Sequence, residues 1–218
     1  MAMIQRLSGY LLASSNVIFE RDTILLSKNM SFVGKYCKSD WEEFTFESKI
    51  PLIELEDITS EGPYYYPVIC RRSGPKILFL SSSKAVVDYI LEKEFSRIFR
   101  PHLIKVQIDI DNLIRTLSLK PAKYVFSFAH ARVSAYGNSL KAVSFYGEDL
   151  SEASLFRSNL ELMNFFTCGL RKAIGGTEII RLGTDGSVAF NVIKQDNLAD
   201  VKEVLKYLRD NNYLNIDL

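Results

Sequence analysis

Short apolar runs separated by polar breaks dominate the first hundred residues and predict a succession of β-strands. Ile4 to Ala13 is the first long run, and Phe44 to Phe46 alternates as a half-buried antiparallel strand does. Tyr65 to Arg72 and Lys76 to Leu80 lie on either side of a Ser73-Gly74-Pro75 turn. About six or seven antiparallel strands of this kind must cover their edges, which predicts a barrel or a sandwich.

A segment with helical periodicity follows these strands. Ser82 or Ser83 can accept hydrogen bonds from the first free amides of a helix that runs from Lys84 to Phe99. Pro101 limits this helix just beyond its end. The apolar positions recur at three- and four-residue spacing and form one stripe: Val87, Ile90, Leu91, Phe95 and Ile98. A helix with a single apolar stripe would close the open end of a barrel.

This order of elements resembles the pleckstrin-homology-like (PH-like) superfold, including its GRAM relatives, in which seven antiparallel strands precede one C-terminal capping helix. The resemblance covers about Ile4 to Phe99 and rests on Ile50 to Ile58, Val68 to Arg72, Lys76 to Leu80 and the helix. It implies an antiparallel β-barrel with a capping helix over residues 1–100.

Two departures from that family bear on its usual ligand. Lipid-binding members carry basic residues around the first hairpin, but here that hairpin is Ser14-Ser15-Asn16 and holds no lysine or arginine. A phosphate group needs clustered donors and positive charge, so we do not expect a phosphoinositide membrane as a partner. The family helix also usually carries a tryptophan, whereas Tyr89 is the nearest aromatic here and Trp41 is the only tryptophan.

The second half alternates strand and helix signals. The predicted strands are Leu103 to Ile110, Tyr124 to Tyr136 and Leu140 to Tyr146, and Glu178 to Val192 should fold about the Asp185-Gly186 turn. The predicted helices are Asp111 to Leu119, Leu155 to Ala173, and a last one capped by Asp196 or Asn197. We therefore expect an α+β protein whose residues 101–218 form an antiparallel sheet with helices on one face.

Size and charge limit the function classes. The chain has 218 residues and a net charge of +1, so no bulk field draws it to nucleic acid or membrane. Cys37, Cys70 and Cys168 lie far apart and are odd in number, which argues against a disulfide framework and favours a reducing compartment. With no apolar run near the roughly 20 residues that span a bilayer and no signal peptide, we expect a cytoplasmic protein.

Two aspartates suggest an enzymatic alternative. Asp109 and Asp111 are two residues apart near a strand end, and paired carboxylates so placed can hold magnesium in nucleotidyl-transfer sites. The alternative is then a metal-dependent nucleic-acid-processing enzyme. We favour the structural reading, in which Asp111 caps its helix and Asp109 is solvated, because aspartate so often occupies such caps.

Histidine and cysteine give no catalytic pattern. His130 lies in the middle of a predicted strand and His102 follows Pro101, and spacing alone does not place a nucleophile beside either. We interpret His130 as a half-buried residue of the sheet. Cys168 lies on the apolar helix predicted from Leu155 to Ala173, where a thiol behaves as a small hydrophobic group.

One basic cluster is a candidate binding site. Arg71, Arg72 and Lys76 surround the Ser73-Gly74-Pro75 turn, and Tyr65 is near in sequence. Interleaved cations and aromatic rings can bind nucleic acid or a phosphorylated partner, although charge also keeps an ordinary hairpin tip solvated. The sequence as a whole favours a non-enzymatic interaction protein without a cofactor, acting through protein contacts as part of a larger complex.

Overall fold

The computed structural model divides the chain into two compact units. One consists of Leu7–Val106, and the other of Met1–Arg6 with Gln107–Leu218. The residues that the structure describes are 5–13, 23–27, 30–35, 41–48, 64–73, 76–81, 87–88, 104–119, 123–133, 142–174, 178–192 and 197–215. The predicted boundary at residues 100–102 lies outside these ranges.

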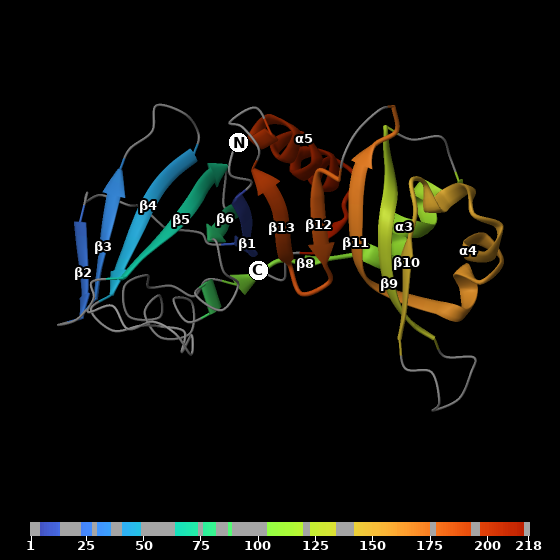
Figure 1. The fold of residues 1–218 in the computed structure, drawn as a ribbon, viewed down its shortest axis with the longest axis horizontal. Helices are drawn as coiled ribbons and strands as arrows, with labels where there is room; N and C mark the ends of the chain where they lie inside the picture. The colour runs from blue at the N-terminus through green and yellow to red at the C-terminus, as the bar shows by residue number, and fades with distance from the viewer. Residues whose placement is uncertain are drawn as a thin grey trace. The chain divides into compact units, whose positions relative to one another are not determined.

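Unit Leu7–Val106 is built on an antiparallel sheet (Figure 1). Its strands pair in the order β1, β6, β5, β4, β3, β2, and β7 adds to the other edge of β1. Their bounds are β1 Gln5–Ala13, β2 Thr23–Ser27, β3 Met30–Lys35, β4 Trp41–Ser48, β5 Tyr64–Ser73, β6 Lys76–Ser81 and β7 Ile104–Lys105.

The predicted closed barrel is wrong. Closure would require the last strand of the sheet to pair with the first, but β1 is bonded along one edge to β6 and at Leu12 and Ala13 to β7. Among the strands described, β2 pairs with β3 and not with β1, so the sheet stays open. The alternation of apolar and polar residues along a strand identifies the two faces of that strand but not the strands that pair with it. The sequence pattern therefore does not show whether the sheet closes into a barrel.

Most of the predicted capping helix, together with the segment Ile50 to Ile58, lies outside the described residues. Val87 and Asp88 are helical, and Val87 is fully buried, as a position on the apolar stripe should be. Lys105 forms an ion pair with Asp88 at 3.4 Å, and its ammonium group also lies 3.7 Å from the centre of the Tyr10 ring. These contacts tie β7 to β1 and to the helical pair.

The other unit contains a five-stranded antiparallel sheet in the order β10, β9, β11, β12, β13 (Figure 1). A second sheet pairs β8 with β14. The bounds are β8 Gln107–Ile108, β9 Tyr124–Val133, β10 Val143–Tyr146, β11 Met163–Lys172, β12 Ile180–Gly183, β13 Ser187–Val192 and β14 Leu214–Asn215. The helices are α3 Ile110–Leu119, α4 Ser154–Ser158 and α5 Asn197–Asp210, with short 3-10 turns η3 Leu150–Glu152 and η4 Leu160–Leu162.

Helices cover one face of the five-stranded sheet. α3 packs on β9 and β11, and α5 packs on β13. The Tyr207 ring of α5 lies 5.2 Å from the ring of Tyr124 on β9, and Phe156 of α4 contacts Phe126 and Phe165 at 5.6 and 5.4 Å between ring centres. We call this side the helix-covered face; it carries the core of the unit.

The predicted helix from Leu155 to Ala173 is wrong over most of its length. Residues 154–158 form α4, but β11 occupies Met163–Lys172 as a central strand between β9 and β12. Phe165, Cys168 and Leu170 are buried on the helix-covered face, and their uneven spacing comes from an irregularity in the strand register between Phe165 and Thr167. A bulge inserts one residue and shifts the alternation, so a strand with a bulge imitates helical spacing.

Candidate binding face

The structure keeps the three predicted cations of β5 and β6 together and separates Tyr65 from them. Arg72 pairs with Ile77 and Ser73 with Lys76, so Arg71, Arg72 and Lys76 lie at the same end of the β5–β6 hairpin. Tyr65 is paired with Glu47. It lies six residues from Arg71 along β5, roughly 20 Å at about 3.3 Å per residue. Tyr65 therefore does not join the cations.

Asp109 and Asp111 make separate contacts at the start of α3. The Asp109 carboxylate accepts a hydrogen bond from the Asn112 amide at 3.1 Å, so Asp109 rather than Asp111 caps the helix. Asp111 accepts from Arg115 Nε at 2.6 Å and from the Phe165 amide at 3.2 Å. Its carboxylate thus joins α3 to β11. Within the described part of the chain, no three His, Cys, Asp or Glu side chains gather in a way that could hold a metal ion.

Cys168 is a core residue of β11 and His130 a half-buried residue of β9. Cys168 has no exposed surface, and its burial together with the nearby Glu178 charge raises the pKa of the thiol to about 12. A thiol that keeps its proton is a poor nucleophile. Both residues have the burial that the sequence suggested, although Cys168 is in a strand.

The face of the sheet opposite the helices carries polar and charged side chains as well as aromatic rings, unlike the apolar helix-covered face. We call it the helix-free face, because no helix in the described ranges packs on it. Strand pairing and alternation assign these residues to it: Ser144, Tyr146, Phe128, His130, Arg132, Phe166, Thr167, Gly169, Arg171, Arg181, Gly183, Ala189 and Asn191.

A β-bulge brings one more aromatic ring to the helix-free face. His130 pairs with Thr167 and Ala131 with Phe165, so Phe166 is the additional residue of β11. In such a bulge two residues of one strand oppose one of its partner. Phe166 accordingly lies beside His130, with 5.7 Å between the ring centres.

Four rings from three strands form a continuous row on this face. Phe128 is central: its ring centre lies 4.5 Å from that of His130 and 5.0 Å from that of Tyr146. Phe166 extends the row beyond His130. Phe128 is 4 % exposed, whereas Tyr146 is 70 % exposed. The buried Phe128 therefore supports the row from within, while Tyr146 is exposed and the rings of His130 and Phe166 are partly exposed.

Two arginines flank this aromatic row. The Arg181 guanidinium lies 4.7 Å from the centre of the Phe128 ring, and that of Arg132 lies 6.0 Å from the centre of Phe166. Both distances are within the range in which a cation is attracted to an aromatic face. The row and its cations thus form one surface, which we call the aromatic–arginine row: Phe128, His130, Arg132, Tyr146, Phe166 and Arg181.

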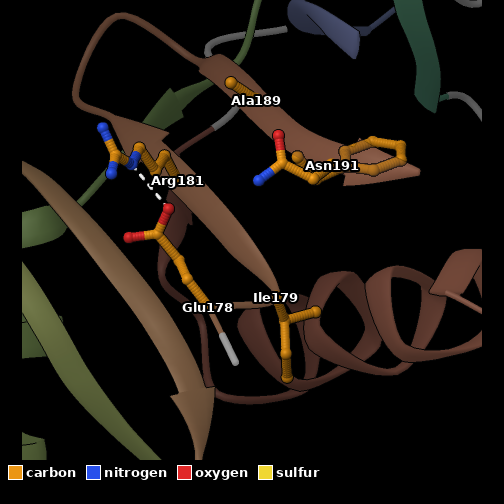
Figure 2. Close-up of a pocket in the computed structure, with 6 residues that line it drawn as sticks. Glu178, Ile179, Arg181, Ala189 and Asn191 are labelled. Carbon is orange, nitrogen blue, oxygen red and sulfur yellow. Dashed lines mark hydrogen bonds and ion pairs between the residues drawn. The ribbon is translucent and has the colours of Figure 1, made fainter. Parts of the chain in front are cut away.

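Glu178 holds one of these arginines in place. Its carboxylate accepts from Arg181 Nε at 2.6 Å, as Figure 2 shows. Gly169 pairs with Arg181 across β11 and β12, and a Cβ atom there would lie 3.2 Å from the Phe128 Cβ and closer still to the Glu178 carboxylate. The missing side chain of Gly169 thus provides the room for Glu178 beside Phe128.

A small pocket adjoins this ion pair. Its lining is Glu178, Ile179, Arg181, Ala189, Phe190 and Asn191 (Figure 2). Its volume of about 60 Å³ is well below the roughly 300–1,000 Å³ of pockets that hold small organic ligands. The pocket suits water or a single protruding group, so the extended aromatic–arginine row is the better candidate for recognition.

Sequence reasoning missed this surface because its parts come from separate strands. The signal available in the sequence was the alternation in residues 124–136, where His130 and Arg132 lie between the apolar Ala129, Ala131 and Val133. The contribution of Tyr146 and Phe166 depends on strand register and on the bulge.

No protein-family model, curated protein or solved structure matches this chain. Among the helices that the structure describes, none is long and apolar enough to cross a membrane.

Proposed function

We propose that this protein is a non-enzymatic binding protein whose binding surface is the helix-free face of the five-stranded sheet. The observation that carries this proposal is the aromatic–arginine row, in which the exposed Tyr146 and the partly exposed rings of His130 and Phe166 lie beside cations. Tyrosine and arginine are among the residues that contribute most to binding energy in interfaces.

The position of Tyr146 supports a binding role. Its side chain is 70 % exposed although it contacts Phe128, so most of its ring contributes no burial to the fold. Covering that ring with a partner would stabilise a complex through the hydrophobic effect, by roughly 25 cal/mol for each Å² of apolar surface removed from water. A cytoplasmic location is part of the proposal, supported by the well-separated cysteines Cys37, Cys70 and Cys168.

Co-purification of the full chain from its native host tests this proposal. The wild type is compared with a variant that carries Arg132→Gln and Tyr146→Ala, which we call the helix-free-face variant. Both substitutions are at exposed positions, so the thermal unfolding of this variant should match that of the wild type. We expect the wild type to retain a specific set of molecules that this variant loses.

The matched control carries Leu119→Ala and Arg209→Gln, which replace an exposed apolar residue and an exposed cation outside the helix-free face. It should retain the wild-type set. If the control loses partners and the helix-free-face variant keeps them, the binding surface lies elsewhere and the proposal is wrong.

A further inference from the structure

The aromatic–arginine row has the composition of a stacking surface. Tyr146, His130 and Phe166 present rings on three neighbouring strands, and the buried Phe128 supports them from within. Neighbouring strands lie about 4.8 Å apart, so the row crosses roughly 10 Å of sheet. One base stacked on each of these three rings gives room for about three bases.

The charge on this face is complementary to a polyanion. Arg132 is exposed, and Arg181 keeps a guanidinium with five N–H donors of which Glu178 engages Nε. Both guanidinium groups lie over rings of the row, at 6.0 and 4.7 Å. A ligand that stacks on the rings would therefore have its anionic groups within reach of the arginines.

Resting on the proposed function, we propose that the helix-free face binds single-stranded nucleic acid, with bases stacked on Tyr146, His130 and Phe166 and phosphates contacted by Arg132 and Arg181. Base–aromatic stacking needs bases that are free of a complementary strand, as in single strands and loops. A duplex keeps its bases paired and stacked on one another, so their faces are not free to stack on these rings.

Fluorescence anisotropy with the full chain and a labelled 12-nucleotide oligouridine tests the proposal, with the equivalent DNA strand and a duplex of matched length in parallel. The two single strands distinguish RNA from DNA as the source of the ligand. We expect at least one of them to bind tenfold or more tightly than the duplex. Affinity should fall with salt, and Arg132→Gln should reduce the slope of log affinity against log salt by about 0.7.

Substitutions at Tyr146 separate stacking from general apolar contact. Tyr146→Phe keeps the ring and should bind within twofold of the wild type. Tyr146→Leu keeps apolar area without a ring and should bind about 5- to 150-fold more weakly, the range found when a stacking ring is removed. Arg209→Gln removes an exposed cation from α5 and should leave binding unchanged.

The inference is overturned if neither single strand binds at low salt, if the duplex binds equally well, or if Tyr146→Phe and Tyr146→Leu have equal effects. Loss of binding on replacing Arg71, Arg72 and Lys76 by glutamine, with no effect of Tyr146→Leu, would instead assign the activity to the β5–β6 hairpin. A different outcome is that no oligonucleotide binds, while the wild type co-purifies with a protein after nuclease treatment and the Arg132→Gln, Tyr146→Ala variant does not. In that case the proposed function stands and this inference is wrong.

Discussion

Gly169 lies at a point of the helix-free face that leaves little room for a side chain. A Cβ atom would press on the Phe128 Cβ at 3.2 Å and on the Glu178 carboxylate, and it would disturb the hydrogen bond that Arg181 Nε donates to Glu178. Adding atoms to a packed site costs about 1–3 kcal/mol of stability.

We therefore expect Gly169→Ala to lower the free energy of unfolding by about 1–3 kcal/mol in a urea titration. The Glu178 side chain is the closest obstacle, so Glu178→Ala in the same chain should recover part of the loss. If the two substitutions are additive, Gly169 does not provide the room for Glu178.

Cys168 offers a test through pH. Burial, followed by the Glu178 charge, raises the pKa of its thiol from 9.0 to about 12. Between these values the unfolded chain releases the proton and the folded chain keeps it, so rising pH favours unfolding. The free energy of unfolding should fall by about 1.4 kcal/mol per pH unit from this group alone.

Urea titrations between pH 8 and 11 measure this dependence, and Cys168→Ala is the comparison that isolates it. The variant should show a shallower decline than the wild type above pH 9, whatever its stability at pH 8. Parallel declines would mean that the thiol is not buried as described.

Elements with a clear local pattern were predicted correctly, whereas β11 was not. α5 and the β12–β13 hairpin follow from a cap, an apolar stripe and the Asp185-Gly186 turn, where Gly186 has a φ of 78°. The helix predicted from Leu155 to Ala173 failed because a bulge in β11 disrupts the alternation that identifies a strand.

Apolar burial, rather than surface charge, should hold α5 on its sheet. Leu208 is fully buried, whereas the Lys172–Asp200 ion pair leaves both side chains about 40 % exposed (40 % and 38 %). We expect Leu208→Ala to lower the free energy of unfolding by about 2–5 kcal/mol. Asp200→Asn should leave the urea midpoint nearly unchanged, because exposed ion pairs contribute little. The reverse order of effects would contradict the packing described for α5.

At the scale of the whole molecule, the proposed binding surface depends on a local group of side chains and not on the overall charge of the chain. A net charge of +1 gives no general attraction to polyanions, so recognition must come from the placement of a few groups. The order of elements in the sequence predicted two halves but neither the open sheet nor the aromatic–arginine row. Both depend on which strands pair, and β-strand register is information about residues far apart in the chain.

Ultraviolet cross-linking of the full chain to a single-stranded oligouridine, followed by mass spectrometry of tryptic peptides, tests most directly whether the helix-free face is the binding surface. Rings stacked on bases are placed to form such cross-links. We expect cross-links in the tryptic peptides 124–132, 142–157 and 158–171, which carry His130, Tyr146 and Phe166. Cross-links confined to α5 or to the β5–β6 hairpin would contradict it.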